Sequence, residues 1–172
     1  MDAVELDIKK ALEDLSAQAT AENWQGEATW TRGVKQALVD VGRRNGFLAG
    51  AQGCDADHPE WLYDVFWFQL DPAKHLTDVP LVAECEWAGP PAVKYDFEKL
   101  LVARSKYRIM VFQSWTQRLA SQSDADEYIL QFILDMKLWT HKYVRTQNED
   151  RYLFAGWART HWIFEHYVVV SV

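Results

Sequence analysis

Cysteine is scarce, with only Cys54 and Cys85 in the chain. Two thiols are too few for a disulfide framework or a four-cysteine zinc site, so a reducing compartment is the expected environment. No run approaches the roughly 18 consecutive apolar residues that a membrane-spanning helix needs. The acidic, amphipathic start lacks the basic and apolar segments of a signal peptide. These absences favour a cytoplasmic protein that does not enter a membrane.

Positive charge is also in short supply. The 172 residues carry 18 Lys and Arg against 25 Asp and Glu, and the formal net charge is −7 at pH 7. A protein held to nucleic acid by a general positive field would have the opposite balance, so any such role must depend on a local site. Basic residues do gather at 94–108 and 137–151, where they either contact a phosphate backbone or form a solvated helix face.

What the sequence has in quantity is hydrophobic residues, which make up 49% of the chain and exclude a disordered protein. Their spacing and the intervening breakers predict helices at 3–17, 20–44, 92–106 and 123–143. Strands are expected at 47–52, 61–70, 80–87, 107–113, 151–158 and 162–170. This order predicts a single α/β (α+β) domain over 1–172, with a central mixed β-sheet flanked by helices.

Three acids stand in predicted strands where apolar residues are expected. Asp64 lies in the 61–70 strand and shares a face with Leu62 and Phe66 if side chains alternate. Glu84 and Glu86 share a face of the next strand, and an antiparallel pairing of the two strands puts Asp64 opposite Glu84. Carboxylates so close together do not all stay ionised unless a cation lies among them. The pattern therefore indicates an acidic centre for a hard ion such as Mg²⁺.

A fourth acid, Glu27, falls in the middle of the apolar stripe of the 20–44 helix. If that helix packs on the sheet, this position directs Glu27 toward the same centre. For any one of these acids alone, an exposed or edge position is the common alternative. Glu27 also has Arg43 and Arg44 on its own helix as possible partners.

Asp64, then Glu84-Cys85-Glu86 after about one hairpin, then a helix and a buried strand, resemble the PD-(D/E)XK nuclease superfamily, the restriction-endonuclease-like fold. That family's αβββαβ core corresponds to residues 20–113, and a helix and strand pair at 123–170 would be additions to it. The resemblance implies a Mg²⁺-dependent endonuclease, with Mn²⁺ as a substitute, that hydrolyses phosphodiester bonds of nucleic acid, DNA being favoured over RNA. It implies as catalytic residues Asp64, Glu84, Glu86 and Lys99, and as metal ligands Asp64, Glu84, Glu27 and the carbonyl of Cys85.

Two features depart from the family's motif. Tyr63 stands where a proline often precedes the aspartate, and Glu86 occupies the position of the motif's lysine. Some members of the family carry that lysine on the following helix, where Lys99 resembles it and where Lys94 and Arg104 are alternatives. A chain without the motif lysine is also consistent with a catalytically inactive interaction or regulatory module. A glycosidase fits less well, because it needs an acid and a base across an open cleft. The acidic total favours a homodimer or a partner protein that supplies recognition.

Overall fold

The computed structural model describes residues 1–114 and 121–170 of the chain. Within these residues, four helices and six strands follow one another in the order that the sequence predicts. The chain forms two compact units, Met1–Cys85 and Glu86–Val172. The mixed α/β class is confirmed, whereas a single domain and a restriction-endonuclease-like core stay predictions.

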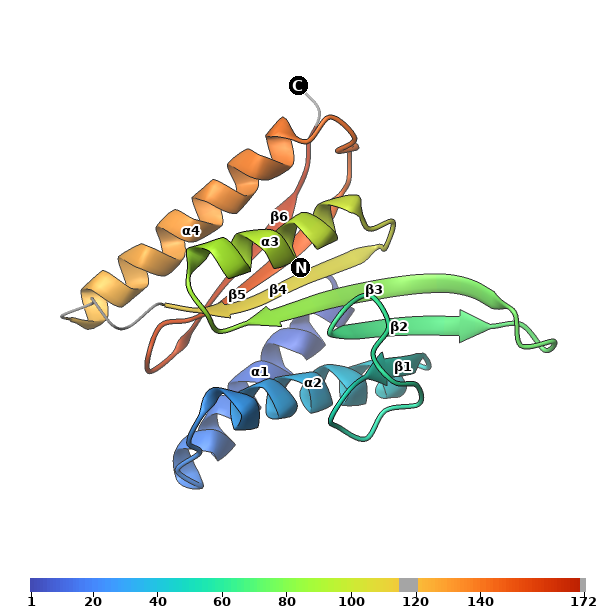
Figure 1. Ribbon diagram of the computed structural model, residues 1–172, viewed down its shortest axis with the longest axis horizontal. Coiled ribbons are helices and arrows are strands. Elements are labelled where there is room, and N and C mark those ends of the chain that lie inside the picture. The colour runs from blue at the N-terminus through green and yellow to red at the C-terminus, as the bar shows by residue number, and fades with distance from the viewer. Residues whose placement is uncertain (115–120, 171–172) are drawn as a thin grey trace. The chain divides into compact units, whose positions relative to one another are not determined.

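The first unit consists of two helices and three strands: α1 (Ala3–Ala21), α2 (Glu27–Arg44), β1 (Leu48–Ala51), β2 (Val65–Leu70) and β3 (Leu76–Glu86). β2 pairs antiparallel with β1 on one side and with β3 on the other. Helix α2 packs on α1, β1 and β2, so the two helices lie together against one side of the strands (Figure 1).

Local signals set the ends of α1 and α2. Asp2 and Glu5 form a capping box, in which the backbone N–H of each donates to the side chain of the other at 2.8 and 3.2 Å. The helix expected over 20–44 is divided, because Asn23 (φ 53°) and Gly26 (φ 79°) adopt left-handed backbone conformations that end α1 and precede α2. The end of α2 is as expected, with a left-handed Gly46 directly after its cap.

The contact between α2 and β2 is built around Trp67. Its side chain is fully buried, and its indole Nε1–H donates to the backbone carbonyl of Leu38 at 3.0 Å. One turn later along the helix, Gly42 makes room for the ring, since a Cβ there would lie 2.5 Å from Nε1. Val34 and Val41 of the same helix face are also fully buried. This packing fixes which face of β2 lies toward α2.

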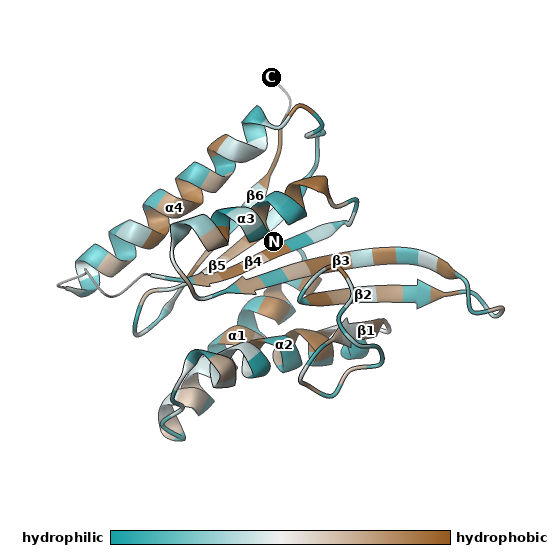
Figure 2. Ribbon diagram, in the orientation of Figure 1, coloured by the Kyte–Doolittle hydropathy of each residue, from teal (hydrophilic) through white to brown (hydrophobic). Residues whose placement is uncertain are grey.

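The second unit contains α3 (Pro90–Val102), β4 (Tyr107–Gln113), α4 (Gln122–Lys142), β5 (Arg151–Trp157) and β6 (Trp162–Val168). β4 and β5 are parallel, and β5 and β6 are antiparallel, so this sheet is mixed. α4 lies between the two parallel strands in the chain, as a crossover requires. Hydrophobic and hydrophilic residues alternate along α4 (Figure 2), and its buried residues, such as Ile129 and Met136, belong to the core. Phe97 of α3 joins that core beside the rings of Tyr152 and Phe154.

Candidate active site

The register of β2 and β3 places Asp64 beside the end of β3 that carries Glu84. Val65 is opposite Ala83, and Phe66 is opposite Val82. This register confirms the antiparallel pairing expected from the sequence, and Asp64 directly precedes the first paired residue of β2. Consistent with this, the backbone N–H of Cys85 donates to Oδ2 of Asp64 at 2.8 Å. The Asp64 carboxylate therefore lies against the peptide that joins Glu84 to Cys85.

The other oxygen of Asp64 contacts a lysine that the sequence did not single out. Lys35 Nζ of α2 lies 2.7 Å from Asp64 Oδ1 and 2.8 Å from Glu60 Oε2. The Lys35 side chain is only 8% exposed, against 19% for Asp64 and 34% for Glu60. Burial alone would lower the pKa of Lys35, but the hydrogen bonds and charges of the two carboxylates outweigh burial and raise it. We call Lys35, Glu60 and Asp64 the Lys35 cluster.

The sequence carried a signal for this buried lysine. Lys35 follows Val34 directly and precedes Leu38 and Val39 by three and four positions, and all three of these are fully buried. A cation bordered on its helix by core residues reaches water poorly, so it needs a carboxylate from another segment. Nothing in the sequence of α2 identified that carboxylate as Asp64.

The expected surroundings of Asp64 need correction. β2 begins at Val65, one residue after Asp64, and Trp61 and Leu62 are exposed instead of forming a strand. Strict alternation would put Asp64 on the face opposite Trp67, away from α2, yet its carboxylate is paired with Lys35 of α2. The alternation therefore ends where the strand ends. An ion pair and a peptide N–H compensate the charge of the Asp64 carboxylate. Asp64 does not share the apolar surroundings of Phe66.

Glu84 and Cys85 lie near the end of β3, where both are buried. The exposed fraction is 1% for Glu84 and 7% for Cys85. A carboxylate at this depth is costly unless polar or charged groups compensate it. Glu84 is therefore placed in the interior of the protein rather than at the exposed or edge position that is common for acids in strands.

The remaining expected site residues have local roles. Glu27 is the first residue of α2 and is exposed. Glu86, in the second unit, is half-buried, and its Oε1 accepts a hydrogen bond from the Ala88 N–H at 2.7 Å. Lys99 forms an ion pair with Asp96 of its own helix at 2.9 Å. The catalytic or ligand roles of these residues stay predictions.

The two alternatives to Lys99 are Lys94, which forms an ion pair on its own helix, and Arg104, which is exposed. Lys94 pairs with Glu98 one turn later on α3 at 3.1 Å. Arg104 follows the end of α3, not within the helix as expected, and is exposed.

The acids of the described residues bear on whether Mg²⁺ can bind here. Across residues 1–114 and 121–170, no group of three or more His, Cys, Asp or Glu side chains is arranged to hold a metal ion. Mg²⁺ often takes only one or two carboxylates, however, and completes its shell with water and substrate oxygens. Asp64 Oδ1 and Oδ2 each accept one hydrogen bond, and each oxygen has a second lone pair. Asp64 thus has lone pairs that could bind Mg²⁺, in competition with Lys35 for the same carboxylate.

Comparisons with family models, with curated proteins and with solved structures gave no match to the chain. Among the helices of the described residues, none is both long enough and apolar enough to cross a membrane. Function must therefore be argued from the site.

Proposed function

We propose that the chain is a Mg²⁺-dependent nuclease that hydrolyses phosphodiester bonds of nucleic acid, DNA being the favoured substrate, with Asp64 and Glu84 as the central acids. The observation that carries the proposal is the position of Asp64. Its carboxylate is oriented by Lys35 and by the N–H of Cys85, the residue that follows the buried Glu84. A carboxylate held in place by a buried cation and a peptide N–H is a candidate functional group.

The chain's own residues would divide the work of hydrolysis. Mg²⁺ held by Asp64 and Glu84 would polarise a phosphoryl oxygen and lower the pKa of a bound water. Lys35 has three N–H donors, of which Asp64 and Glu60 take two, and the third would donate to a substrate oxygen. Its positive charge would offset the negative charge that builds on the phosphoryl group in the transition state. Lys35 thus takes the role that the family resemblance assigned to Lys99.

A cleavage assay tests the proposal. Purified protein is incubated with plasmid, single-stranded DNA and RNA in Mg²⁺ or Mn²⁺, beside Glu84→Gln and Glu13→Gln variants. Glu13 is an exposed acid of α1, so its variant controls for the loss of one negative charge. We expect Glu84→Gln to reduce the cleavage rate by a factor of about 100 or more, because metal-ion stabilisation of the transition state is worth several kcal/mol. Equal cleavage by all three proteins would indicate a contaminating nuclease and remove the support for the proposal.

A second candidate function is a catalytically inactive interaction module. Two observations favour it: the hydrogen bonds that Asp64 already accepts on both oxygens, and Glu86, whose carboxylate caps the Ala88 N–H at the motif's lysine position. If this function is correct, no nucleic acid is cleaved under any metal condition and divalent ions do not act through Asp64.

A further inference from the structure

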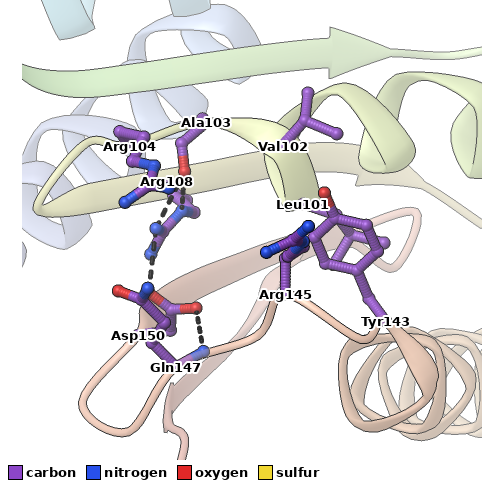
Figure 3. Close-up of a pocket in the computed structure, with 9 residues that line it drawn as sticks. All are labelled: Leu101, Val102, Ala103, Arg104, Arg108, Tyr143, Arg145, Gln147 and Asp150. Atoms are coloured by element: carbon purple, nitrogen blue, oxygen red, sulfur yellow. Dashed lines mark hydrogen bonds and ion pairs between the residues drawn. The ribbon is translucent and has the colours of Figure 1, made fainter.

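A basic pocket in the second unit has no part in the proposed catalysis. It has a volume of about 170 Å³ and is lined by residues 101–104, Arg108 and the turn that follows α4. Its charged residues are Arg104, Arg108, Arg145 and Asp150, so three positive charges face one negative charge (Figure 3). In a chain with a net charge of −7, this local excess is unusual. The pocket brings together the two basic segments at 94–108 and 137–151.

Arg108 forms the rigid base of this pocket. Its side chain is 7% exposed, and its Nε and Nη2 atoms donate to the carbonyl of Ala103 at 3.2 and 2.9 Å. Nη2 also donates to Asp150 Oδ1 at 2.9 Å, and the guanidinium stacks 5.2 Å from the centre of the Tyr152 ring. Within the described residues, no hydrogen bond uses Nη1 of Arg108. The pocket therefore has a fixed guanidinium whose donors are only partly used.

The walls of the pocket are held in place as well. Asp150 Oδ2 accepts the backbone N–H of Gln147 at 2.8 Å, which closes the turn 147–150 (Figure 3). The preceding turn, which carries Arg145, is closed by the Thr146 N–H, which donates to the Tyr143 carbonyl at 3.0 Å. Arg104 and Arg145 are exposed and come from opposite walls, one after α3 and the other after α4. Asp150 neutralises about one of the three guanidinium charges. The remaining two match the charge of a phosphomonoester, which carries −1.5 to −2 at about pH 7.

We propose that this pocket binds a phosphomonoester dianion, the group found on a mononucleotide and at the phosphorylated end of a nucleic acid. Arginine is suited to this task because its planar fork donates two parallel hydrogen bonds to phosphate oxygens. A volume of about 170 Å³ holds a phosphate group with part of its sugar, but not a whole nucleotide. The base or the rest of the strand would lie outside, past the half-buried ring of Tyr143.

Fluorescence anisotropy of the full-length protein tests this site. The probes are a labelled single-stranded DNA with a 5′-phosphate, the same strand with a 5′-hydroxyl, and unlabelled adenosine 5′-monophosphate as competitor. All measurements contain a chelator, so that metal-dependent cleavage and binding at Asp64 do not contribute. The variants are Arg104→Gln, Arg145→Gln and their combination. These are exposed residues, whereas replacing the buried Arg108 would endanger folding. Arg32→Gln, at an exposed position of α2, is the matched control.

We expect the 5′-phosphorylated strand to bind more tightly than the 5′-hydroxyl strand. Each arginine removed should lower the affinity about tenfold, because a hydrogen bond to a charged group contributes about 1.5 kcal/mol. Arg32→Gln should bind like the wild type. Competition by adenosine 5′-monophosphate at a similar concentration would identify a free nucleotide as the ligand, and weak competition would identify a strand end. Equal binding of the two strands, or equal affinity of the double variant and Arg32→Gln, would overturn the proposal. Failure of this site would leave the nuclease assay unaffected.

Discussion

At the scale of single residues, the Lys35 cluster decides the electrostatics of the first unit. A lysine with 8% exposure pays a large desolvation cost, which two short contacts to carboxylates offset. The register of β2 and β3 could be predicted, because strand pairing follows from a short connection and an alternating pattern. Lys35 could not be assigned as a partner, because a lysine on an amphipathic helix is normally exposed. Its burial depends on a contact between segments that are distant in the sequence.

Replacing Lys35 should therefore cost stability. We expect Lys35→Met to lower the free energy of unfolding by about 3 kcal/mol, since it leaves two carboxylates without their cation in a mostly buried place. Urea denaturation of both proteins measures the difference. Lys10→Met is the matched control, because Lys10 pairs with Asp14 at the surface, where an ion pair is worth about 0–1 kcal/mol. Similar losses in the two variants would mean that the Lys35 cluster is solvated in solution.

The stability difference between wild type and Lys35→Met should depend on pH. The folded-state pKa of Lys35 is raised above the ordinary value of 10.5. The cluster's contribution is therefore complete below about pH 10 and is lost as the pH rises through the folded-state pKa. The stability gap between wild type and Lys35→Met should be constant between about pH 7 and pH 9 and should narrow above about pH 10.5. Burial raises the pKa of Tyr152 to about 12, and its titration affects both proteins, so only the difference between them reports on Lys35. A gap that does not narrow in alkali contradicts the assignment.

At the scale of elements, the sequence predicts the order of helices and strands better than their ends. β4 matches its predicted span over 107–113, because its centre, residues 109–112, is an uninterrupted run of apolar residues. The starts of α2 and β2 differ, for separate physical reasons. The apolar stripe predicts one helix over 20–44, but the left-handed Asn23 and Gly26 interrupt it. Asp64 departs from the alternating strand pattern because its carboxylate binds Lys35. Both boundaries depend on backbone strain or tertiary contact, which periodicity does not report.

The close contact between α2 and β2 gives a prediction at this scale. Gly42→Ala should destabilise the protein by about 1–2 kcal/mol, because the new Cβ would overlap the Trp67 ring. In an open helix the same change would be stabilising by about 1 kcal/mol, so the sign of the effect tests the contact. The measurement is a double-mutant cycle with Trp67→Phe, whose smaller ring lacks the Nε1 atom that the Cβ would meet. In that background Gly42→Ala should be neutral or stabilising. A stabilising effect of Gly42→Ala alone would show that α2 does not pack this closely.

At the scale of the whole molecule, net charge and local charge have opposite signs. The chain carries −7 overall, yet Lys35 lies between Asp64 and Glu60, and three arginines line the pocket of the second unit. Composition could exclude a protein covered with positive charge, but it could not locate these two places. Arg104, Arg108 and Arg145 come from three segments and meet only in the fold. If the chain acts on nucleic acid, long-range attraction does not assist it, and recognition depends on short contacts or on a partner.

The net charge also shapes the test for a metal ion. Any salt screens the repulsion among the excess carboxylates, so a general rise in melting temperature with MnCl₂ is no proof of a site. We expect a further rise in the wild type that Asp64→Asn abolishes and that Asp14→Asn, at an exposed acid of α1, preserves. At 100 times the dissociation constant the gain is about 2.7 kcal/mol, or about 5–10 °C for a protein of this size. Differential scanning fluorimetry at constant ionic strength measures it.

A Lys35 variant in the same experiment distinguishes a metal-dependent nuclease from an inactive interaction module. Because Lys35 already binds Oδ1 of Asp64, it would compete with a metal ion proposed for that carboxylate. Lys35→Met should then bind Mn²⁺ more tightly than the wild type, although it is less stable without metal. An inactive module in which the Lys35 cluster is purely structural predicts the loss of stability without the gain in Mn²⁺ response. Equal Mn²⁺ responses in wild type, Asp64→Asn and Lys35→Met would therefore remove Asp64 from any metal site and favour the interaction module over the nuclease.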